Sequence, residues 1–392
     1  MNPPEARSQT PDPGPRIPDA PRLLVRGTNW LGDAVMTTPA LMRLREKFPD
    51  AHIALLTPEK LRDLWTNHSA VNETISFAPD ESIFSVGQKL RAGKFDLALV
   101  LPHSPRSAIE TWLAGIPKRI GYARPWRNFF LTNAMAPRTG VTEMRKRSAG
   151  EIRRLVAADV NRRTICENRA FTSAAASAHQ IHEYLHLAAT LGANPEPLAP
   201  QLFVSPGELE AAKKKFGLEK IAPPVFGLNP GAEYGPAKRW PVERFIAAAH
   251  EIQTRTNCVW LIFGGKNDTA VADEIQSAIG NRQSAILNLA GKTSLRELMS
   301  LLKLCRVLLT NDSGPMHVAA ALGTPVVVPF GSTSPELTGP GLPGDPRHRL
   351  LKSDAPCSPC FLRECPIDFR CLNGIGVERV VEAVLSCCGT LL

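Results

Sequence analysis

Three stretches of the chain place glycine, small polar residues and a charged side chain directly after an apolar run. The strongest pattern runs from Leu309 to His317. A buried strand followed by such a turn and a helix leaves the first helical N–H groups unpaired. Together with the helix dipole, these groups bind anions. Asp312 or Ser313 could cap the helix, and Gly314 would let a phosphate approach the backbone closely. An ordinary helix start, with His317 as a core residue, fits this loop equally well.

The second stretch, Asn229–Pro241, also follows an apolar run and precedes an amphipathic one. It is long for a connection in an α/β domain, and long loops in compact domains tend to be functional or disordered. A tryptophan and several prolines would stiffen it, which favours a functional loop. Lys238 could contact a diphosphate, whereas the ordinary role of a single lysine is a solvated surface charge.

The third stretch, Gly27–Met36, has a glycine at each end of a strand-to-helix turn, Gly27 and Gly32, and Asp33 at the start of the helix. It lacks the Gly-x-Gly-x-x-Gly spacing, so it is not a dinucleotide-binding fingerprint. Taken alone, Asp33 would be interpreted as a helix cap.

The elements that must position these loops alternate short β-branched runs with amphipathic stretches, which is typical of parallel βαβ units. Strands are expected at 22–26, 52–56, 96–101, 225–228, 259–263, 286–289, 307–309 and 325–328. Helices are expected from the first turn to about Lys47 and over 179–191, 242–255, 269–279, 294–304 and 314–322. Ligands of open α/β sheets bind beyond the carboxyl ends of the strands. The loops expected to form a site therefore begin after Arg26, Leu228, Phe263 and Leu309.

The predicted fold class is α/β, with two Rossmann-like domains that face each other across a cleft. The expected division is a disordered tail (1–21), an N-terminal domain (22–192), a proline-rich linker (193–200) and a C-terminal domain (201–392). A chain of 392 residues with 43% apolar and 21% charged residues fits two globular domains.

Composition also restricts the class of protein. The sequence shows no secretory signal and no run of the roughly 20 apolar residues that a membrane span needs. Nine cysteines are too few and too unevenly placed for a secreted disulfide scaffold, so a cytoplasmic protein is expected. The formal net charge of +9 favours anionic partners such as nucleic acid, phosphorylated small molecules or an acidic membrane surface.

Taken together, the three loops resemble those of the bacterial glycosyltransferase family 9 heptosyltransferases. The resemblance is carried by Asn29-Trp-Leu-Gly-Asp33 with Met36-Thr-Thr-Pro39, by Pro230-Gly-Ala-Glu-Tyr-Gly-Pro-Ala-Lys-Arg-Trp-Pro241, and by the stretch from Thr310 to Ala321 with Gly331-Ser-Thr-Ser-Pro335. It extends from about Arg22 to the C-terminus. Residues 141–177 depart from it and show no recognised family pattern.

The resemblance implies a GT-B fold and an inverting, metal-independent transfer without a cofactor. The donor would be ADP-heptose, bound by the C-terminal domain. The acceptor would be Kdo–lipid A that carries one heptose, bound by the N-terminal domain, and the reaction would extend this first heptose of the lipopolysaccharide inner core. The resemblance also implies a cytoplasmic enzyme that is peripheral to the inner membrane and acts at its inner-leaflet surface, with no nucleic acid as partner.

Residue roles carried over from the family begin with Asp33 as the general base. No Asp-x-Asp metal motif occurs in the three loops, so cationic and backbone donors would stabilise the leaving diphosphate. The expected donor-binding residues are Lys238, Asp312, Ser313, Gly314, His317, Asn267 and Asp268. Of these, His317 would either point at the diphosphate or pack its helix, and Asn267 or Asp268 would accept from ribose hydroxyls.

A glycine- and basic-rich stretch, Gly115–Gly121, and the residues after it lie on the expected acceptor side. The candidate acceptor-binding residues there are Lys118, Arg119, Arg124 and Arg127. They would contact Kdo carboxylates and phosphates. Each one alone is more typical of a solvated surface charge.

Four cysteines crowd one segment near the C-terminus: Cys357, Cys360, Cys365 and Cys371. Such a cluster could bind zinc or an iron–sulfur centre, but the spacing does not match a zinc ribbon. Free or structural thiols are favoured over a metal site.

Two alternatives stay open at this stage. One is another member of the family, heptosyltransferase I or III, although the Gly-Ala-Glu-Tyr stretch favours an enzyme that extends the first heptose. The other is a non-catalytic module that binds anionic polymers, suggested by the +9 charge. It lacks support from any nucleic-acid motif, and an aromatic content of 6% argues against stacking platforms.

Overall fold

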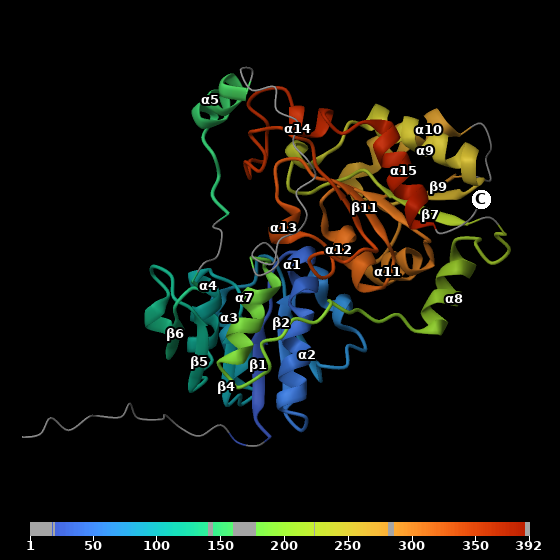
Figure 1. Cartoon of the computed structure of the whole chain (residues 1–392). Helices are drawn as coiled ribbons and strands as arrows, with labels where there is room; N and C mark the ends of the chain where they lie inside the picture. Colours follow the sequence, from blue (N-terminus) through green and yellow to red (C-terminus); the bar gives the residue numbers. More distant parts are fainter. Residues whose placement is uncertain are drawn as a thin grey trace, which may run out of the picture.

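The structure is a computed structural model that describes residues 18, 20–139, 144–159, 178–222, 224–280 and 286–388. Most of the predicted tail (1–21) and parts of the 141–177 segment lie outside the described residues. The described chain forms two α/β domains, each built on one six-stranded sheet (Figure 1).

Every strand pair in both sheets is parallel. The first sheet contains β1 (Arg22–Arg26), β2 (His52–Pro58), β3 (Glu73–Phe77), β4 (Leu97–Val100), β5 (Lys118–Tyr122) and β6 (Asn133–Met135). The second contains β7 (Val225–Asn229), β8 (Val259–Ile262), β9 (Ile286–Asn288), β10 (Leu308–Thr310), β11 (Val326–Pro329) and β12 (Arg349–Leu351).

The two sheets share one topology. The strand order is β3-β2-β1-β4-β5-β6 in the first sheet and β12-β11-β10-β7-β8-β9 in the second. When β7 to β12 are numbered 1 to 6 and the second sheet is read from its β9 edge, both orders are 3-2-1-4-5-6. This is the doubly wound order of Rossmann-like domains, with a switch point between β1 and β4 and another between β7 and β10. The prediction of two Rossmann-like domains is confirmed; their boundaries in the sequence stay a prediction.

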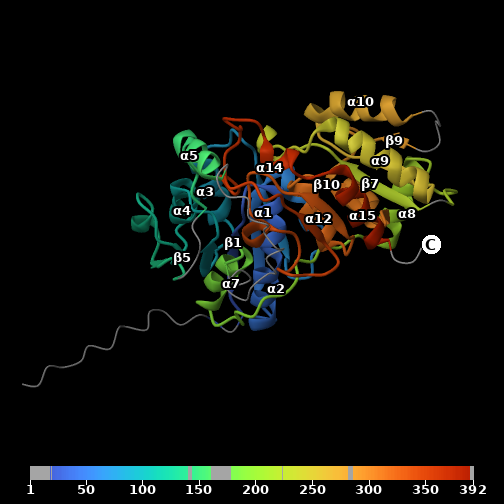
Figure 2. The same cartoon turned by 45° about the horizontal axis from the view of Figure 1, so that its top comes forward.

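Helices cover the faces of both sheets (Figures 1 and 2). In the first half of the chain they are α1 (Leu31–Met36), α2 (Thr38–Lys47), α3 (Ile83–Arg91), α4 (Pro105–Leu113) and α7 (Ile181–Ala189). Helix α5 (Ala149–Asp159) instead packs against the C-terminal half of the chain, where Ile152 forms an apolar cluster with Cys357 and Cys360 (Figure 1). In the second half they are α8 (Pro206–Lys215), α9 (Val242–Thr256), α10 (Thr269–Ile279), α11 (Leu295–Leu304), α12 (Gly314–Ala321), α13 (Pro335–Thr338), α14 (Arg370–Asn373) and α15 (Val377–Cys387). Short 3₁₀ helices are η1 (Glu59–Trp65), η2 (Asn128–Phe130), η3 (Pro236–Lys238) and η4 (Lys266–Asp268). Among the helices of the described residues, none combines the length and apolar composition needed to cross a bilayer.

The single helix predicted up to about Lys47 is wrong, because the structure divides it into α1 and α2 at Thr37. Pro39 has no N–H to donate to the Val35 carbonyl, so the helical ladder breaks there. The Thr38 hydroxyl donates to that carbonyl instead, at 2.9 Å. The break makes α1 a short helix at the end of β1.

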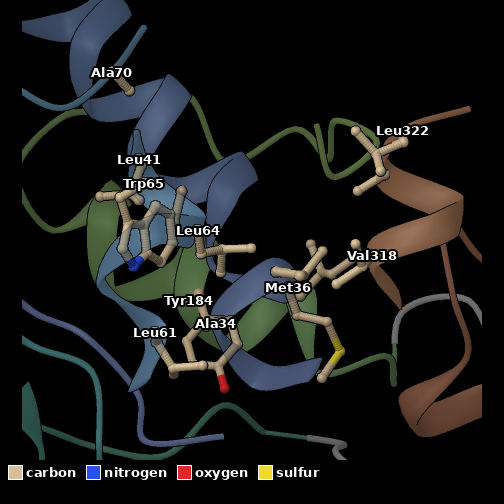
Figure 3. Packing of buried hydrophobic residues seen from close by; sticks show 14 of the residues in the cluster. Ala34, Met36, Leu41, Leu61, Leu64, Trp65, Ala70, Tyr184, Val318 and Leu322 are labelled. Atoms are coloured by element: carbon tan, nitrogen blue, oxygen red, sulfur yellow. The ribbon is translucent and has the colours of Figure 1, made fainter. Parts of the chain in front are cut away.

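The two domains meet where α1 packs against α12. Both helices have a glycine at the point of closest approach. A Cβ on Gly32 would lie 2.7 Å from His317 Cδ2, and a Cβ on Gly314 would lie 2.9 Å from Leu31 Cβ. Figure 3 shows Met36 beside Val318 in one apolar cluster that includes residues of both domains. These two glycines therefore allow the contact that brings the loops of the two domains together.

Candidate active site

The turn that carries Asp33 is held by a buried ion pair. Arg26, the last residue of β1, is 1% exposed, and its Nε donates to Glu110 of α4 at 2.8 Å. The Arg26 Nη1 also donates to the Asn29 side chain at 3.1 Å. A paired charge of this kind cannot move without leaving its partner unsatisfied in the interior, so the turn between β1 and α1 is fixed.

Asp33 lies in the first turn of α1 and faces the second domain. Burial raises the pKa of Asp33 to about 6, although the nearby Lys238 and a hydrogen bond from Gln180 lower it. The Gln180 Nε2 donates to Asp33 Oδ1 at 3.5 Å and to the Tyr184 hydroxyl at 2.8 Å. A carboxyl group whose pKa lies near neutrality is a better general base than an ordinary aspartate.

Lys238, at the end of η3, reaches the carboxylate that follows β10. Its Nζ lies 2.6 Å from Asp312 Oδ2, and the two side chains are 14% and 4% exposed. The Thr333 hydroxyl donates to the same Asp312 oxygen at 2.5 Å. Because the Lys238 charge also acts on Asp33, one ammonium group faces a carboxylate from each domain.

The start of α12 differs from the sequence prediction. Neither Asp312 nor Ser313 caps the helix, because no side chain accepts from its first N–H groups. Asp312 is turned toward Lys238, and the Ser313 hydroxyl accepts from Asn229 Nδ2 at 3.1 Å. The first N–H donors of α12, beginning at Gly314, therefore keep the anion-binding character of an uncapped helix start.

His317 is a packing residue. It is 5% exposed, and its ring lies against Gly32 of the other domain. Burial lowers the pKa of His317 to about 4, so the imidazole is neutral at physiological pH. Of the two roles expected for His317, the structure favours packing of the helix.

The sequence did not reveal the network that orders the long loop after β7. Asn229 Nδ2 donates to the Gly231 carbonyl at 3.3 Å and to Thr310 Oγ1 at 3.0 Å. Asn311 accepts from the Trp240 backbone N–H at 2.9 Å and donates to the Pro230 carbonyl at 2.6 Å. These side-chain amides connect the loop to the end of β10. The sequence feature that could have indicated the network is the presence of polar residues at the ends of two buried strands.

A cavity of about 310 Å³ opens beside this loop. It combines apolar walls with the polar group of Asp268, and its lining residues include Pro230, Trp240, Phe245, Asp268, Val271 and Leu372. The Asp268 carboxylate accepts from the Gly265 N–H at 2.9 Å, whereas Asn267 is exposed and does not line the cavity. The contribution of Leu372 comes from a distant part of the chain, so the sequence could not indicate the cavity.

On the N-terminal side, Arg124 and Arg127 follow the carboxyl end of β5. Arg127 is 0% exposed, and its Nη1 donates to the Pro102 carbonyl at 2.6 Å. Its Nε and Nη2 have no hydrogen-bond partner among the described residues. Burial and the charge of Arg124 lower the pKa of Arg127 to about 10, so it remains a cation at neutral pH.

Lys118 and Arg119 lie elsewhere. They are the first residues of β5, at the amino end of the sheet, whereas Asp33 follows the carboxyl end of β1. Arg119 also donates to the Phe130 carbonyl at 2.7 Å. The two ends of this five-residue strand are four residue steps, roughly 13 Å, apart, so the structure does not bring these two candidates to the cleft.

A second carboxylate near this site, Glu183 of α7, was not predicted from the sequence. Its oxygen lies 4.0 Å from His103 Nε2, and burial raises the pKa of Glu183 while Arg124 lowers it. Tyr122 donates to the Glu183 carbonyl at 2.9 Å. Because α7 follows the segment with no recognised pattern, nothing in the sequence connected Glu183 to this site.

The cysteine segment is hydrogen-bonded to the loop that carries Lys238. Three of its thiols are buried and Cys365 is half-buried, and all are free. The Arg363 carbonyl accepts from the Ala237 N–H at 3.0 Å, and the Phe361 carbonyl accepts from the Tyr234 hydroxyl at 2.7 Å. Across the described parts of the chain, no three His, Cys, Asp or Glu side chains are arranged to hold a metal ion. The absence of a metal at this segment stays a prediction, and its backbone carbonyls connect it to the Lys238 loop.

Comparisons with known proteins agree with this geometry. The profile of glycosyltransferase family 9 (heptosyltransferase) matches residues 153–369. The chain is 33% identical to lipopolysaccharide heptosyltransferase 2 of Escherichia coli K12 over 333 residues, which is 81% of this chain and 85% of that protein. It is 32% identical to lipopolysaccharide heptosyltransferase 2 of Salmonella typhimurium over the same length and shares. The chain belongs to glycosyltransferase family 9. It is therefore a glycosyltransferase, as the three loops predicted.

The solved structure of E. coli ADP-heptose lipopolysaccharide heptosyltransferase II superposes with a TM-score of 0.74 at 29% identity, covering 94% of this chain and 98% of that one. The predicted GT-B fold is confirmed. The profile match begins at residue 153, so it includes part of the 141–177 segment in which the sequence showed no family pattern.

Proposed function

We propose that this glycosyltransferase moves L-glycero-D-manno-heptose from ADP-heptose onto the first heptose of the lipopolysaccharide inner core, with inversion. One observation carries the proposal: Lys238 of the C-terminal domain pairs with Asp312 at 2.6 Å and also lowers the pKa of Asp33 in the N-terminal domain. A group able to neutralise a diphosphate and a group able to accept a proton therefore face each other where the domains meet.

The chemistry assigned to Asp33 is general-base catalysis. Its carboxylate takes the proton of the acceptor hydroxyl while that oxygen attacks the anomeric carbon. The bond from this carbon to the ADP oxygen breaks on the opposite face, which gives inversion. A pKa of about 6, raised by burial, leaves Asp33 ionised at neutral pH and more basic than a solvated aspartate.

The departing diphosphate gains negative charge, and we assign its stabilisation to Lys238 and to the N–H groups of Ser313 and Gly314 at the start of α12. Lys238 would exchange its contact with Asp312 for the diphosphate, which frees the Asp312 carboxylate to accept from a heptose hydroxyl. The proposal includes no metal or other cofactor. His317 keeps its packing role.

The cavity beside the Lys238 loop fits the nucleoside. Its apolar walls suit an adenine ring, and Asp268 at its edge suits the ribose hydroxyls, with Asn267 nearby on the same 3₁₀ helix, η4. Concave, mostly apolar sites with a few polar groups are typical of nucleotide-sized ligands.

On the acceptor side we assign Arg124 and Arg127 to the anionic groups of a Kdo–lipid A acceptor that carries one heptose. The support is the buried Arg127 guanidinium, two of whose nitrogen atoms lack a partner among the described residues. Such an acceptor implies a cytoplasmic enzyme that works at the inner-leaflet surface of the membrane.

The deciding experiment compares acceptors. ADP-heptose is supplied with Kdo–lipid A that carries no heptose or one heptose, and the product is analysed by mass spectrometry. We expect one heptose to be added to the heptosylated acceptor only. Transfer to the heptose-free acceptor alone would assign the chain to the first step instead, and binding without any transfer would support the non-catalytic alternative.

A further inference from the structure

An aromatic and basic surface stands out on the N-terminal domain, outside the active site. Trp126 is 90% exposed, Phe129 is 83% exposed and Trp112 is 43% exposed. Phe130 joins two of them: its ring centroid lies 5.5 Å from that of Trp112 and 5.5 Å from that of Phe129. Trp126 lies three residues before Phe129 in the loop between β5 and β6. Single exposed apolar residues are ordinary, but several large exposed aromatic side chains on neighbouring segments mark an interaction site.

The backbone holds the most exposed of these rings outward. Trp126 has a φ of 64°, in the left-handed region that bulky residues rarely adopt. The residue is anchored on both sides, because Arg124 N–H donates to the Asn128 side chain at 2.8 Å and Arg127 is buried beneath the loop. A tryptophan kept in solvent at a strained position has no role in the packing of this domain.

The charge around the aromatic cluster has one sign. Between residues 111 and 139 the chain contains no aspartate or glutamate. The same stretch has basic residues at Lys118, Arg119, Arg124, Arg127 and Arg138. All except Arg127 are partly exposed. The natural complement of such a surface is a partner with dense negative charge and an apolar layer behind it.

We propose that this surface, formed by Trp112, Trp126, Phe129 and Phe130 with their basic neighbours, docks the enzyme onto an anionic phospholipid membrane. Tryptophan and phenylalanine side chains bury their rings at the boundary between headgroups and acyl chains, and lysine and arginine are attracted to anionic lipids. A protein partner would also cover the aromatic rings. Protein surfaces carry charges of both signs, however, so a protein partner does not explain why this stretch contains no carboxylates. Docking rests on the proposed function, because a lipid-anchored acceptor requires the enzyme to work at a bilayer.

The position of this docking surface fits the delivery of such an acceptor. Helix α4 and strand β5 lie on the side of the N-terminal domain that is turned away from the C-terminal domain (Figures 1 and 2). Arg124, two residues before Trp126, lies close enough to the cleft to lower the pKa of Glu183. Arg124 therefore connects the docking surface to the acceptor side of the active site.

The test uses the full chain with acceptor-free vesicles of phosphatidylcholine, alone or mixed with phosphatidylglycerol, in a sedimentation assay. We expect binding to the mixed vesicles that weakens at high salt, and little binding to phosphatidylcholine alone. The double variant Trp126→Ala/Phe129→Ala should reduce the bound fraction by about tenfold. Phe203→Ala is the matched control, since Phe203 is 51% exposed but precedes α8 on the other domain, and it should bind as the wild type does.

A second readout separates docking from catalysis. The double variant should transfer heptose at the wild-type rate to a water-soluble, delipidated acceptor and several times more slowly to acceptor embedded in mixed vesicles. Wild-type vesicle binding by the double variant would overturn the proposal, as would failure of the wild type to bind anionic vesicles. Self-association that the double variant abolishes, without any effect on vesicle binding, would assign the surface to a second copy of the chain instead. Vesicle binding without transfer to any acceptor would refute the proposed function and leave the docking surface standing.

Discussion

The two switch points of this molecule share a topology but differ in how their polar groups are satisfied. At the C-terminal one, Asn229, Asn311 and Asp312 all have partners within the domain. At the N-terminal one, two nitrogen atoms of the buried Arg127 have no partner among the described residues. Asp33 accepts a long hydrogen bond, 3.5 Å, from Gln180.

This difference separates two ways of building a binding site. A network whose members satisfy one another is ordered before the ligand arrives, so Lys238 and Asp312 already lie at the donor site and only exchange partners when the donor binds. Buried charges without partners are costly until a ligand of the opposite sign completes them. We infer that the donor half is preorganised and the acceptor half is completed by its substrate.

The largest expected effect follows the removal of the proton acceptor. Asp33→Asn should lower kcat by about 10³-fold or more, because a neutral amide cannot take the proton of the acceptor hydroxyl. ADP affinity, measured by calorimetry, should stay within about twofold of wild type, since the donor network lies on the other domain. Retention of most activity by Asp33→Asn would remove Asp33 from its role as base.

The next largest effect concerns the donor half. Lys238→Ala should lower kcat by about 10²-fold, since the leaving diphosphate loses its cation. The variant also leaves Asp312 buried without its ion pair, so thermal unfolding should be measured in parallel. Lys238→Met/Asp312→Asn, which removes both charges, should restore stability but not activity; recovery of activity would show that Lys238 acts only through the fold.

A substitution in the acceptor half should have a smaller effect, and this effect should appear in the KM for the acceptor instead of in kcat. Arg127→Gln should raise the KM for the lipopolysaccharide acceptor by about tenfold and leave the KM for ADP-heptose unchanged. Lys118→Gln, which removes a charge at the opposite end of β5, is the matched control and should match wild type in steady-state assays with a water-soluble acceptor. Equal effects of the two substitutions would contradict the assignment of Arg127 to a specific anionic group.

The smallest effect is a shift in pH dependence. Asp33 works as the carboxylate, and burial raises its pKa to about 6, so kcat should fall about tenfold per pH unit below that value. The hydrogen bond from Gln180 lowers the pKa of Asp33, and Gln180→Leu should therefore move this acidic limb to higher pH. A pH–rate profile of the variant that coincides with the wild-type profile would exclude Gln180 from the positioning of Asp33.

Much of the fold could be predicted because local patterns dominate it. Strand β1 and helix α10 have the predicted bounds, and most of the second sheet was predicted to within a residue or two. Strands β3, β5, β6 and β12 were not predicted. In β5 the first two residues are basic and the apolar part is short. The division between α1 and α2 was missed because a proline near a helix start is also compatible with a continuous helix.

The sequence by itself determined the two βαβ series, the family, and the loops that hold Asp33, Lys238 and Asp312, since each of these depends on residues close together in the chain. Only the tertiary structure decided which charges meet. It turned Asp312 toward Lys238 instead of the helix start, brought Glu183 and Gln180 of a distant segment beside Asp33, and left Lys118 and Arg119 at the far end of their strand. The physical reason is that charge and hydrogen-bond interactions act over a few ångströms of space, and the close packing of α1 on α12, rather than distance along the chain, sets that spacing.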